Sequence, residues 1–422
     1  MPEVFPVLLV ITAVVAWLNA RFLKLPSTIG VMTAALVLSV AMLGLDLAGV
    51  GRPRDYAAAL FGAIDFSQVL MEGMLSILLF AGALQVDLKH LANYRWQVGL
   101  LAVVGTVAAS LLTGLGLYYL LPLTGLVLPL AYCMVFGALI APTDPISVTG
   151  LLRKVGAPAR LETVVAGESL FNDGVGIVVF TLMAAAAATH HAPSVADTGM
   201  LLLREAGGGL LFGMVLGFVT YQMLKSIDSY QEEVLVTLAA VVGGYGLAHA
   251  LGISGPLAMV ATGILIGNRG RRKAMSDLTR QHVDQFWELL DSILNAVLFV
   301  LIGFEALLLP FSGPLVGAGM LAICITLAAR LLTAGAPVAL LGKRAGLPQG
   351  AWQVLTWGGL RGGISVALAL SLPPGPERGA VVTITYIVVV FSVLVQGLSM
   401  ERLVRKVVPC AQPQDGEPGN AP

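Results

Sequence analysis

The sequence predicts an all-α polytopic membrane protein with about thirteen transmembrane helices. Of its 422 residues, 57% are hydrophobic and 11% are charged, whereas about a quarter are charged in an ordinary soluble domain. The mean hydropathy is +0.89, and the apolar residues form blocks of roughly 17–25, the length that crosses a bilayer as a helix. Helices are required because backbone polar groups in lipid must bond within their own segment.

The predicted spans follow these apolar blocks along the chain. The ninth block is the shortest, and the seventh separates two sets of six. The approximate ranges are 4–20, 28–45, 67–88, 97–121, 125–150, 160–187, 201–224, 233–251, 255–268, 284–309, 312–341, 349–372 and 379–400.

The distribution of Lys and Arg between the loops predicts the orientation. Eighteen of the 24 basic residues lie in loops after odd-numbered spans or in the C-terminal tail, and four lie on the other side. Because cytoplasmic loops carry the excess of Lys and Arg, we expect the N-terminus outside and the C-terminus in the cytoplasm. The remaining two, Arg330 and Arg361, fall inside spans.

Other features of the composition narrow the function. The net charge is zero, which argues against a nucleic-acid partner. Three widely spaced cysteines predict neither a disulfide framework nor a metal cluster. The first residues lack a basic region, so no cleavable signal peptide is expected. His190 and His191 are expected to be a solvated loop pair, and residues 407–422 a disordered tail. No catalytic domain is expected.

Span five is predicted to be interrupted at Ala141-Pro142-Thr143-Asp144-Pro145. Two prolines remove two backbone donors, and Pro142 ends the first half of the helix. Pro145 suits the first position of a second half-helix, and Asp144 suits its N-cap. We expect carbonyl groups near Pro142 and Thr143 to lack helical partners and to be able to face a cation.

Span twelve contains a second interruption, where four glycines surround Arg361 between residues 357 and 363. Span twelve comes seven spans after span five. Successive spans cross the membrane in alternating directions and seven is odd, so the two segments run in opposite directions. Spans one to six and eight to thirteen would then be inverted repeats joined by span seven. Paired interrupted helices in corresponding positions indicate the binding site of a transporter.

Five charged residues are expected in the central parts of spans: Asp144, Glu168, Asp173, Arg330 and Arg361. Each costs roughly 2.5–3.5 kcal/mol at a helix centre on insertion scales. Three negative charges face two positive charges, so one carboxylate has no counter-charge. A buried carboxylate without a counter-charge will hold either a proton or a metal cation.

Helical spacing separates the two acids of Gly167-Glu168-Ser169-Leu170-Phe171-Asn172-Asp173-Gly174. Glu168 shares a helix face with Asn172, and Ser169 shares one with Asp173. Glu168 and Asp173 are five residues apart, about 140° around the helix. We therefore predict that Asp173, with Ser169 beside it, is the exchangeable site, and that Asn172 orients it without adding charge.

The other charged residues are assigned structural roles. Glu168 is predicted to pair with Arg330, and pairing with Arg361 is the alternative. Asp144 is expected to cap the positive end of a half-helix. Arg361 is expected near the negative end of the first half of span twelve.

These residues resemble the sodium/proton exchanger branch of the cation/proton antiporters, in particular its NhaP-type bacterial members. The likeness extends over spans three to twelve. The stretches that carry it are Leu79-Phe80-Ala81-Gly82-Ala83-Leu84-Gln85-Val86-Asp87-Leu88, Pro142-Thr143-Asp144-Pro145, Gly167–Gly174, Leu298-Phe299-Val300-Leu301-Ile302-Gly303 and Gly358-Gly359-Leu360-Arg361-Gly362.

The resemblance implies a homodimer in which an interface unit holds a moving core unit. The implied division is interface residues 1–95 and 231–310, core residues 96–190 and 311–406, linker helix 191–230 and tail 407–422.

The resemblance also implies the site and the activity. Asp173, Ser169 and Thr143 would bind the transported Na+, with Asn172, Glu168 and Asp144 around them. The protein would be no enzyme and would need no cofactor besides the transported Na+ and H+. It would exchange Na+ (or Li+) for H+ by alternating access, electroneutrally, in the cell membrane, and so serve pH homeostasis. The alternatives are K+/H+ antiport in the same fold and, in a different class, a cation channel.

Overall fold

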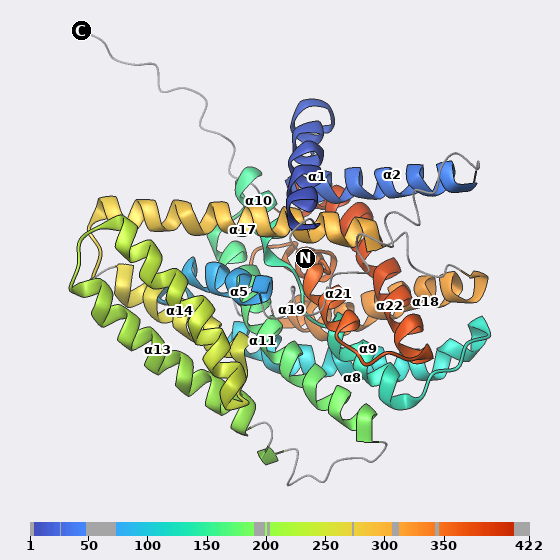
Figure 1. Cartoon of the computed structure of the whole chain (residues 1–422). Coiled ribbons are helices and arrows are strands. Elements are labelled where there is room, and N and C mark those ends of the chain that lie inside the picture. Colours follow the sequence, from blue (N-terminus) through green and yellow to red (C-terminus); the bar gives the residue numbers. More distant parts are fainter. Residues whose placement is uncertain are drawn as a thin grey trace.

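Helices make up most of the part of the chain that the structure describes, as predicted (Figure 1). The structure is a computed structural model. It describes residues 4–25, 27–47, 73–189, 199–200, 203–271, 274–305, 312–341 and 346–408. His190, His191 and the predicted tail from residue 409 onward lie outside these ranges.

Within the described ranges, every predicted span overlaps a helix or consecutive helices. Among the described residues, eight helices are long and apolar enough to cross a membrane, and three shorter apolar ones accompany them. The count of thirteen crossings stays a prediction. The first half of the chain contains α1 (Val4–Leu18), η1 (Asn19–Leu23), α2 (Ser27–Leu47), α5 (Leu75–Leu84), α6 (Leu88–Ala92), α7 (Arg95–Gly99), η3 (Leu100–Gly105), α8 (Thr106–Leu120), η4 (Leu121–Thr124), α9 (Leu130–Ile140), α10 (Pro145–Lys154) and α11 (Ala159–Thr189).

In the second half, π-helical turns continue several α-helices. The turn η7 joins α18 to α19, and η8 joins α22 to α23, so each set forms one long segment. The elements are η5 (Leu203–Gly207), α13 (Gly208–Lys225), α14 (Tyr230–Leu251), α15 (Gly255–Leu265), η6 (Ile266–Gly270), α17 (Asp277–Glu305), α18 (Gly313–Arg330), η7 (Leu331–Gly335), α19 (Ala336–Leu341), α20 (Ala351–Trp357), α21 (Gly363–Leu370), α22 (Pro376–Phe391), η8 (Ser392–Gly397) and α23 (Leu398–Val407).

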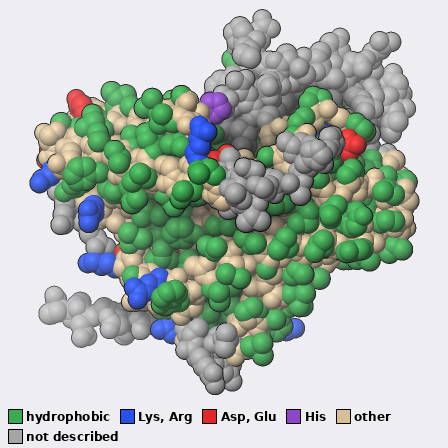
Figure 2. All heavy atoms as spheres, turned by 90° about the horizontal axis from the view of Figure 1, so that it is seen from below, with side chains coloured by type: hydrophobic (Ala, Val, Ile, Leu, Met, Phe, Trp, Pro, Cys, Tyr) green, Lys and Arg blue, Asp and Glu red, His purple; other side chains and the backbone are tan. Residues whose placement is uncertain are grey.

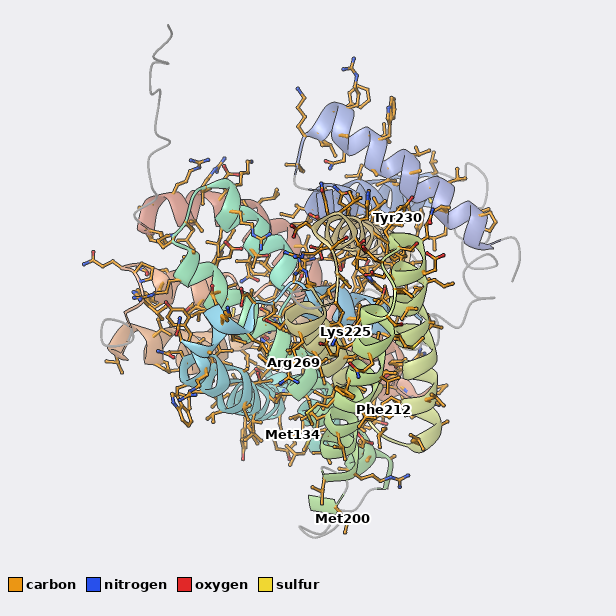
Figure 3. The ribbon with its side chains drawn as sticks, turned by 90° about the vertical axis from the view of Figure 1, so that its left-hand side faces the viewer. Met134, Met200, Phe212, Lys225, Tyr230 and Arg269 are labelled. Carbon is orange, nitrogen blue, oxygen red and sulfur yellow. The ribbon has the colours of Figure 1, made fainter. Side chains whose placement is uncertain are left out.

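The helices pack in two groups. In one, α5 contacts α15, α14 and α17, α17 contacts α1 and α2, and α13 packs on α14 and α15. In the other, α9 contacts α8, α11, α21 and α22, and α18 contacts α8 and α22. In Figure 1, α13 and α14 lie on the opposite side of the molecule from α18 and α22. Figure 3 shows α13 and α14 side by side, with Phe212 on the first and Tyr230 at the start of the second.

The outer surface is that of a membrane protein. Large apolar side chains such as Val10, Val40, Trp96 and Leu340 are exposed. Hydrophobic side chains are spread over the whole described part of the face shown in Figure 2, and most of the Lys and Arg visible there lie in its left half. A soluble protein rarely exposes such contiguous apolar area, whereas lipid tails accept it without cost.

Both predicted interruptions are present and touch each other. The helix α9 ends at Ile140 and α10 begins at Pro145, while α20 ends at Trp357 and α21 begins at Gly363. The backbone N–H of Asp144 donates to the carbonyl of Leu360 at 2.7 Å. The two unwound segments therefore meet inside the protein, which satisfies polar backbone that lipid could not.

Candidate functional site

Arg361 binds the carboxyl end of the opposite broken helix. Its Nη1 donates to the carbonyls of Ala141 and Pro142, at 2.5 and 2.9 Å, and its backbone N–H donates to Oγ of Ser392 at 2.8 Å. The guanidinium neutralises the negative end of α9. This differs from the expectation that Arg361 would serve its own half-helix. The carbonyl of Pro142 is also bonded to this arginine, although it was expected to face a cation.

The carboxyl end of α20 is satisfied by other side chains. Nε of Arg330 donates to the carbonyl of Leu355 at 3.1 Å, and Nε2 of Gln396 donates to that of Trp357 at 3.0 Å. A Cβ added to Gly359 would lie 2.8 Å from Nε of Arg330. Glycine is therefore needed here because the arginine side chain passes directly against the unwound backbone.

Glu168 forms a bidentate ion pair with Arg330, the first of the two alternatives that the sequence left open. Nη1 and Nη2 donate to Oε1 and Oε2 at 2.7 and 2.8 Å, and the carboxylate is 1% exposed. Nδ2 of Asn172 donates to the same Oε1 at 2.9 Å. Glu168 thus has a full set of donors, and such charge-assisted bonds in parallel hold a buried carboxylate ionised and fixed.

Asn172 connects this ion pair to the first interruption. Its Nδ2 also donates to Oγ1 of Thr143 at 2.8 Å, and its Oδ1 accepts from the backbone N–H of Thr143 at 3.2 Å. Oγ1 of Thr143 lies 2.8 Å from Oγ of Ser169. The amide therefore fixes the unwound segment against α11, and the two hydroxyl groups are bonded to each other.

Asp173 has surroundings of the opposite kind. It is 5% exposed, and its Oδ1 is buried with no hydrogen-bond partner. Within the described residues it forms no ion pair: Asp144 and Glu168 repel its charge, and Arg361 attracts it from a distance. An unsatisfied buried carboxylate is costly, so it requires a proton or a cation to be stable.

Asp173 lines a small cavity where the two interruptions meet. The cavity has a volume of about 70 Å³ and is also lined by Thr143, Asp144, Asn295 and Ser365. Ser169 and Asn172, both expected at the ion, do not line it and lie behind Thr143. The oxygens facing the cavity suit a hard cation. Among the described residues, no group of three His, Cys, Asp or Glu is placed to hold a metal ion.

The prediction of five charged residues within spans needs correction. Asp291 on α17 is 8% exposed and Glu233 on α14 is fully buried, and each has a carboxylate oxygen without a hydrogen-bond partner. Glu233 begins the predicted span 233–251, and Asp291 is the eighth residue of the predicted span 284–309. For Asp291, the sequence held a usable signal: Glu288, Asp291 and Asn295 follow the spacing of one helix face.

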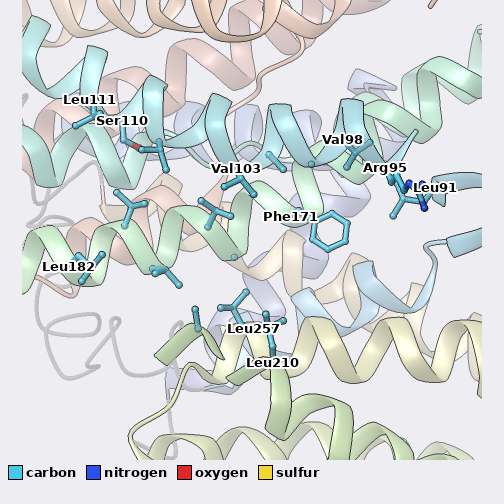
Figure 4. A pocket seen from close by; sticks show the side chains of 18 of the residues that line it. Leu91, Arg95, Val98, Val103, Ser110, Leu111, Phe171, Leu182, Leu210 and Leu257 are labelled. Atoms are coloured by element: carbon cyan, nitrogen blue, oxygen red, sulfur yellow. The ribbon is translucent and has the colours of Figure 1, made fainter. Parts of the chain in front are cut away.

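A larger hollow lies elsewhere and is not an ion site. It has a volume of about 890 Å³ and is lined mainly by the segment from α6 to α8 and by α11, with Leu210 of α13 and Leu257 of α15 also contributing. Figure 4 shows apolar side chains such as Val103, Leu182 and Leu257 lining it, with Arg95 at one end. Because its walls are almost wholly apolar, it offers a small cation nothing to replace its hydration shell.

Comparison with known proteins finds relatives over nearly the whole chain. Residues 9–406 match the family model described as "Sodium/hydrogen exchanger, transmembrane". The chain is 50% identical over 401 residues to the Na+/H+ antiporter NhaP of Pseudomonas aeruginosa, covering 94% of this chain and 95% of that one. It is 34% identical to the Na+/H+ antiporter NhaH of Halobacillus dabanensis, covering 92% and 93%.

A solved structure is similar over the same length. The sodium proton antiporter MjNhaP1 of Methanocaldococcus jannaschii at pH 8 superposes with a TM-score of 0.73, at 19% identity, covering 95% of this chain and 97% of that one. At this identity the likeness shows the fold alone.

Proposed function

The chain belongs to the sodium/hydrogen exchanger family, and we propose that it exchanges Na+ for H+ across the membrane at Asp173. The resemblance read from its motifs is thereby confirmed at the level of the family. One observation supports the site above all others. Asp173 is a buried carboxylate without an arginine partner, and it lines the cavity between the two interruptions.

Competition for one carboxylate accounts for the coupling. A proton and Na+ both neutralise Asp173, and the cavity of about 70 Å³ has room for about two water molecules at the volume of liquid water, hence for one dehydrated cation. Asp173, Thr143 and Asp144 supply oxygen near the cation, and Ser169 and Asn172 hold Thr143 in place. One ion replaces one proton, so the exchange is electroneutral. The same cavity would bind Li+.

Movement of one packed group against the other supplies alternating access. The interface unit (1–95 and 231–310) corresponds to α1, α2, α5, α14, α15 and α17, and the core unit (96–190 and 311–406) to the group around α9, α11, α18 and α22. All charged residues of the site except those on α17 belong to the core unit. When the site is empty, the charge of Asp173 opposes movement of the core unit through the membrane. When the site is occupied, the ion or proton neutralises that charge and the core unit can move.

The remaining features of the proposal concern the assembly. We place the protein in the inner membrane as a homodimer, N-terminus outside and C-terminus cytoplasmic, as the distribution of Lys and Arg predicts. The surface of the interface unit, which includes α1 and α14, would form the dimer contact.

Everted membrane vesicles test this function. With an imposed acid interior, adding NaCl should release protons in vesicles that contain the wild-type protein, and LiCl should do likewise. Asp173→Asn keeps the shape and removes the charge, so it should abolish the release. Asp277→Asn is the matched control, because that side chain is 95% exposed on the first turn of α17. Proton release by Asp173→Asn equal to that of the control would refute the site, and release with KCl alone would refute the choice of Na+.

A further inference from the structure

A polar hollow adjoins the cavity that contains Asp173. It has a volume of about 340 Å³, and Gly82 and Leu170 line both spaces. Arg153 at its rim lies in the last turn of α10, next to the basic residues that predict the cytoplasmic side. In this predicted orientation, the hollow lies between the cytoplasm and the cavity and is the path that connects them.

The charge on this hollow is negative. Its lining includes the carboxylates of Asp87, Glu162, Glu288 and Asp291 and the single guanidinium of Arg153. Arg153 pairs with Glu162, so the lining retains an excess of acid. A cleft lined by charge of one sign concentrates ions of the opposite sign.

Asp291 stands at the inner part of this path. On α17, Glu288, Asp291 and Asn295 lie on one face: Glu288 is exposed at the hollow, whereas Asn295 lines the cavity of Asp173. Seven residues of helix span about 10 Å. Asp291 lies between them and is only 8% exposed.

The carboxylate of Asp291 is not engaged as a structural acid would be. Its Oδ1 is buried and has no hydrogen-bond partner, and within the described residues it forms no ion pair. Nδ2 of Asn295 donates to the backbone carbonyl of Asp291 at 3.0 Å, and the same amide, which is uncharged, also interacts with the Asp291 carboxylate. The charged groups that act on it are Asp144 and Glu288, and both are acidic. A buried carboxylate with two acidic neighbours and no basic partner is stable only with a proton or a cation nearby.

We propose that Asp291 is a second binding station for the transported cation, between the cytoplasmic hollow and Asp173. The proposal rests on the function assigned above and extends it. A cation that leaves the hydrated hollow loses water before it reaches Asp173, and the carboxylate of Asp291 compensates for that loss. The station raises the affinity for the cation from the side of Arg153 and has no role on the opposite side.

Measuring transport from each face tests this station. In everted vesicles, where the predicted cytoplasmic face is outside, Asp291→Asn should raise the half-saturating Na+ concentration by about tenfold, the lower end of the enrichment that a charged cleft gives. In right-side-out vesicles the half-saturating concentration should change less than twofold. The maximal rate at saturating Na+ should be retained on both faces.

Further variants separate this result from a loss of folding. Asp291→Glu keeps the charge and should retain affinity close to that of the wild type. Asp277→Asn, on the same helix, should behave as the wild type. Equal affinities of Asp291→Asn and wild type on the everted face, or the same shift on both faces, would overturn the proposal. If the wild type itself exchanges no Na+ for H+, the function assigned above fails instead, and that outcome is recognised before any variant is compared.

Discussion

Glu168 and Asp173 lie five residues apart on α11 and are buried to a similar degree, at 1% and 5% exposure, yet their surroundings are opposite. Glu168 receives two bonds from Arg330 and one from Asn172. Asp173 has a buried oxygen without a partner and faces a cavity. The comparison teaches that burial alone does not decide the role of an acid in a membrane protein. The presence of a fixed donor set decides it.

The two buried arginines explain how this difference is maintained. Arg330 is bound to Glu168 and to the end of α20, and Arg361 is bound to the end of α9. Among the described residues, neither guanidinium forms an ion pair with Asp173, although Nε of Arg361 is buried without a hydrogen-bond partner and this arginine attracts the charge of Asp173. The positive charge near the site is therefore used to stabilise the interrupted helices, and the surplus negative charge remains where the ion is expected.

The largest effect is expected when the fixed pair is broken. Glu168→Gln leaves Arg330 buried without a counter-charge, which should lower the free energy of unfolding by about 3–5 kcal/mol. Thermal or denaturant unfolding in detergent measures this loss. Asp173→Asn, at a similar depth on the same helix, should leave the stability unchanged or raise it. Equal destabilisation by the two variants would remove the contrast between the two acids.

The geometry of the pair, apart from its charge, is tested by Arg330→Lys. An ammonium cannot make two parallel bonds to Glu168 and also reach the carbonyl of Leu355, so one charge-assisted bond or more is lost. The expected loss of stability is about 1.5–3 kcal/mol, the value of a hydrogen bond to a charged group. The unfolding midpoint of this variant should lie between the midpoints of the wild type and Glu168→Gln. A midpoint equal to that of the wild type would contradict a bidentate pair.

Sodium should stabilise the wild-type protein through Asp173. At a Na+ concentration ten times the dissociation constant, binding adds about 1.4 kcal/mol to the free energy of unfolding. Because protons compete for the same carboxylate, this stabilisation should grow as the pH rises. The melting temperature, compared in NaCl and in choline chloride over a pH series, measures it. Asp173→Asn should show no Na+-dependent shift at any pH, and a shift equal to the wild type would move the site elsewhere.

The smallest effect is expected at an exposed ion pair. Lys154 and Glu401 lie 3.2 Å apart, with side chains 63% and 31% exposed. Lys154→Gln should change the stability by about 0.5 kcal/mol or less, because exposed pairs are screened and lose side-chain entropy. The same unfolding experiment therefore compares an exposed pair with the buried pair of Glu168. A loss as large as that of Glu168→Gln would show that the measurement does not resolve buried from exposed charge.

Much of the fold could be predicted because it depends on neighbours along the chain. Blocks of apolar residues predict helices, and the prolines at 142 and 145 and the glycines around Arg361 predict the two interruptions. The i to i+4 spacing of Glu168 and Asn172 predicts their contact, which the structure shows at 2.9 Å. The partner of Glu168 was open between Arg330 and Arg361, because both lie far away in the sequence.

Asp291 shows where prediction from sequence stopped. The spacing of Glu288, Asp291 and Asn295 on one helix face was the signal in the sequence, but spacing alone does not tell whether such a face is hydrated or buried. Its environment is made by α17 lying across the interruptions, with Asn295 against the cavity and Leu298 against Gly363. Only that long-range packing removes water from the carboxylate.

By itself, the sequence determined the class of the protein, the helices, the two interruptions and the excess of buried acid, because hydrophobicity, helix breaking and charge are properties of residues and their near neighbours. The tertiary structure alone decided which arginine Glu168 binds, that Arg361 serves the opposite half-helix, and that Asp173 and Asp291 are left without a fixed counter-charge. Those outcomes depend on contacts between residues more than a hundred positions apart. No local pattern encodes such distances, since they arise only when the helices have packed.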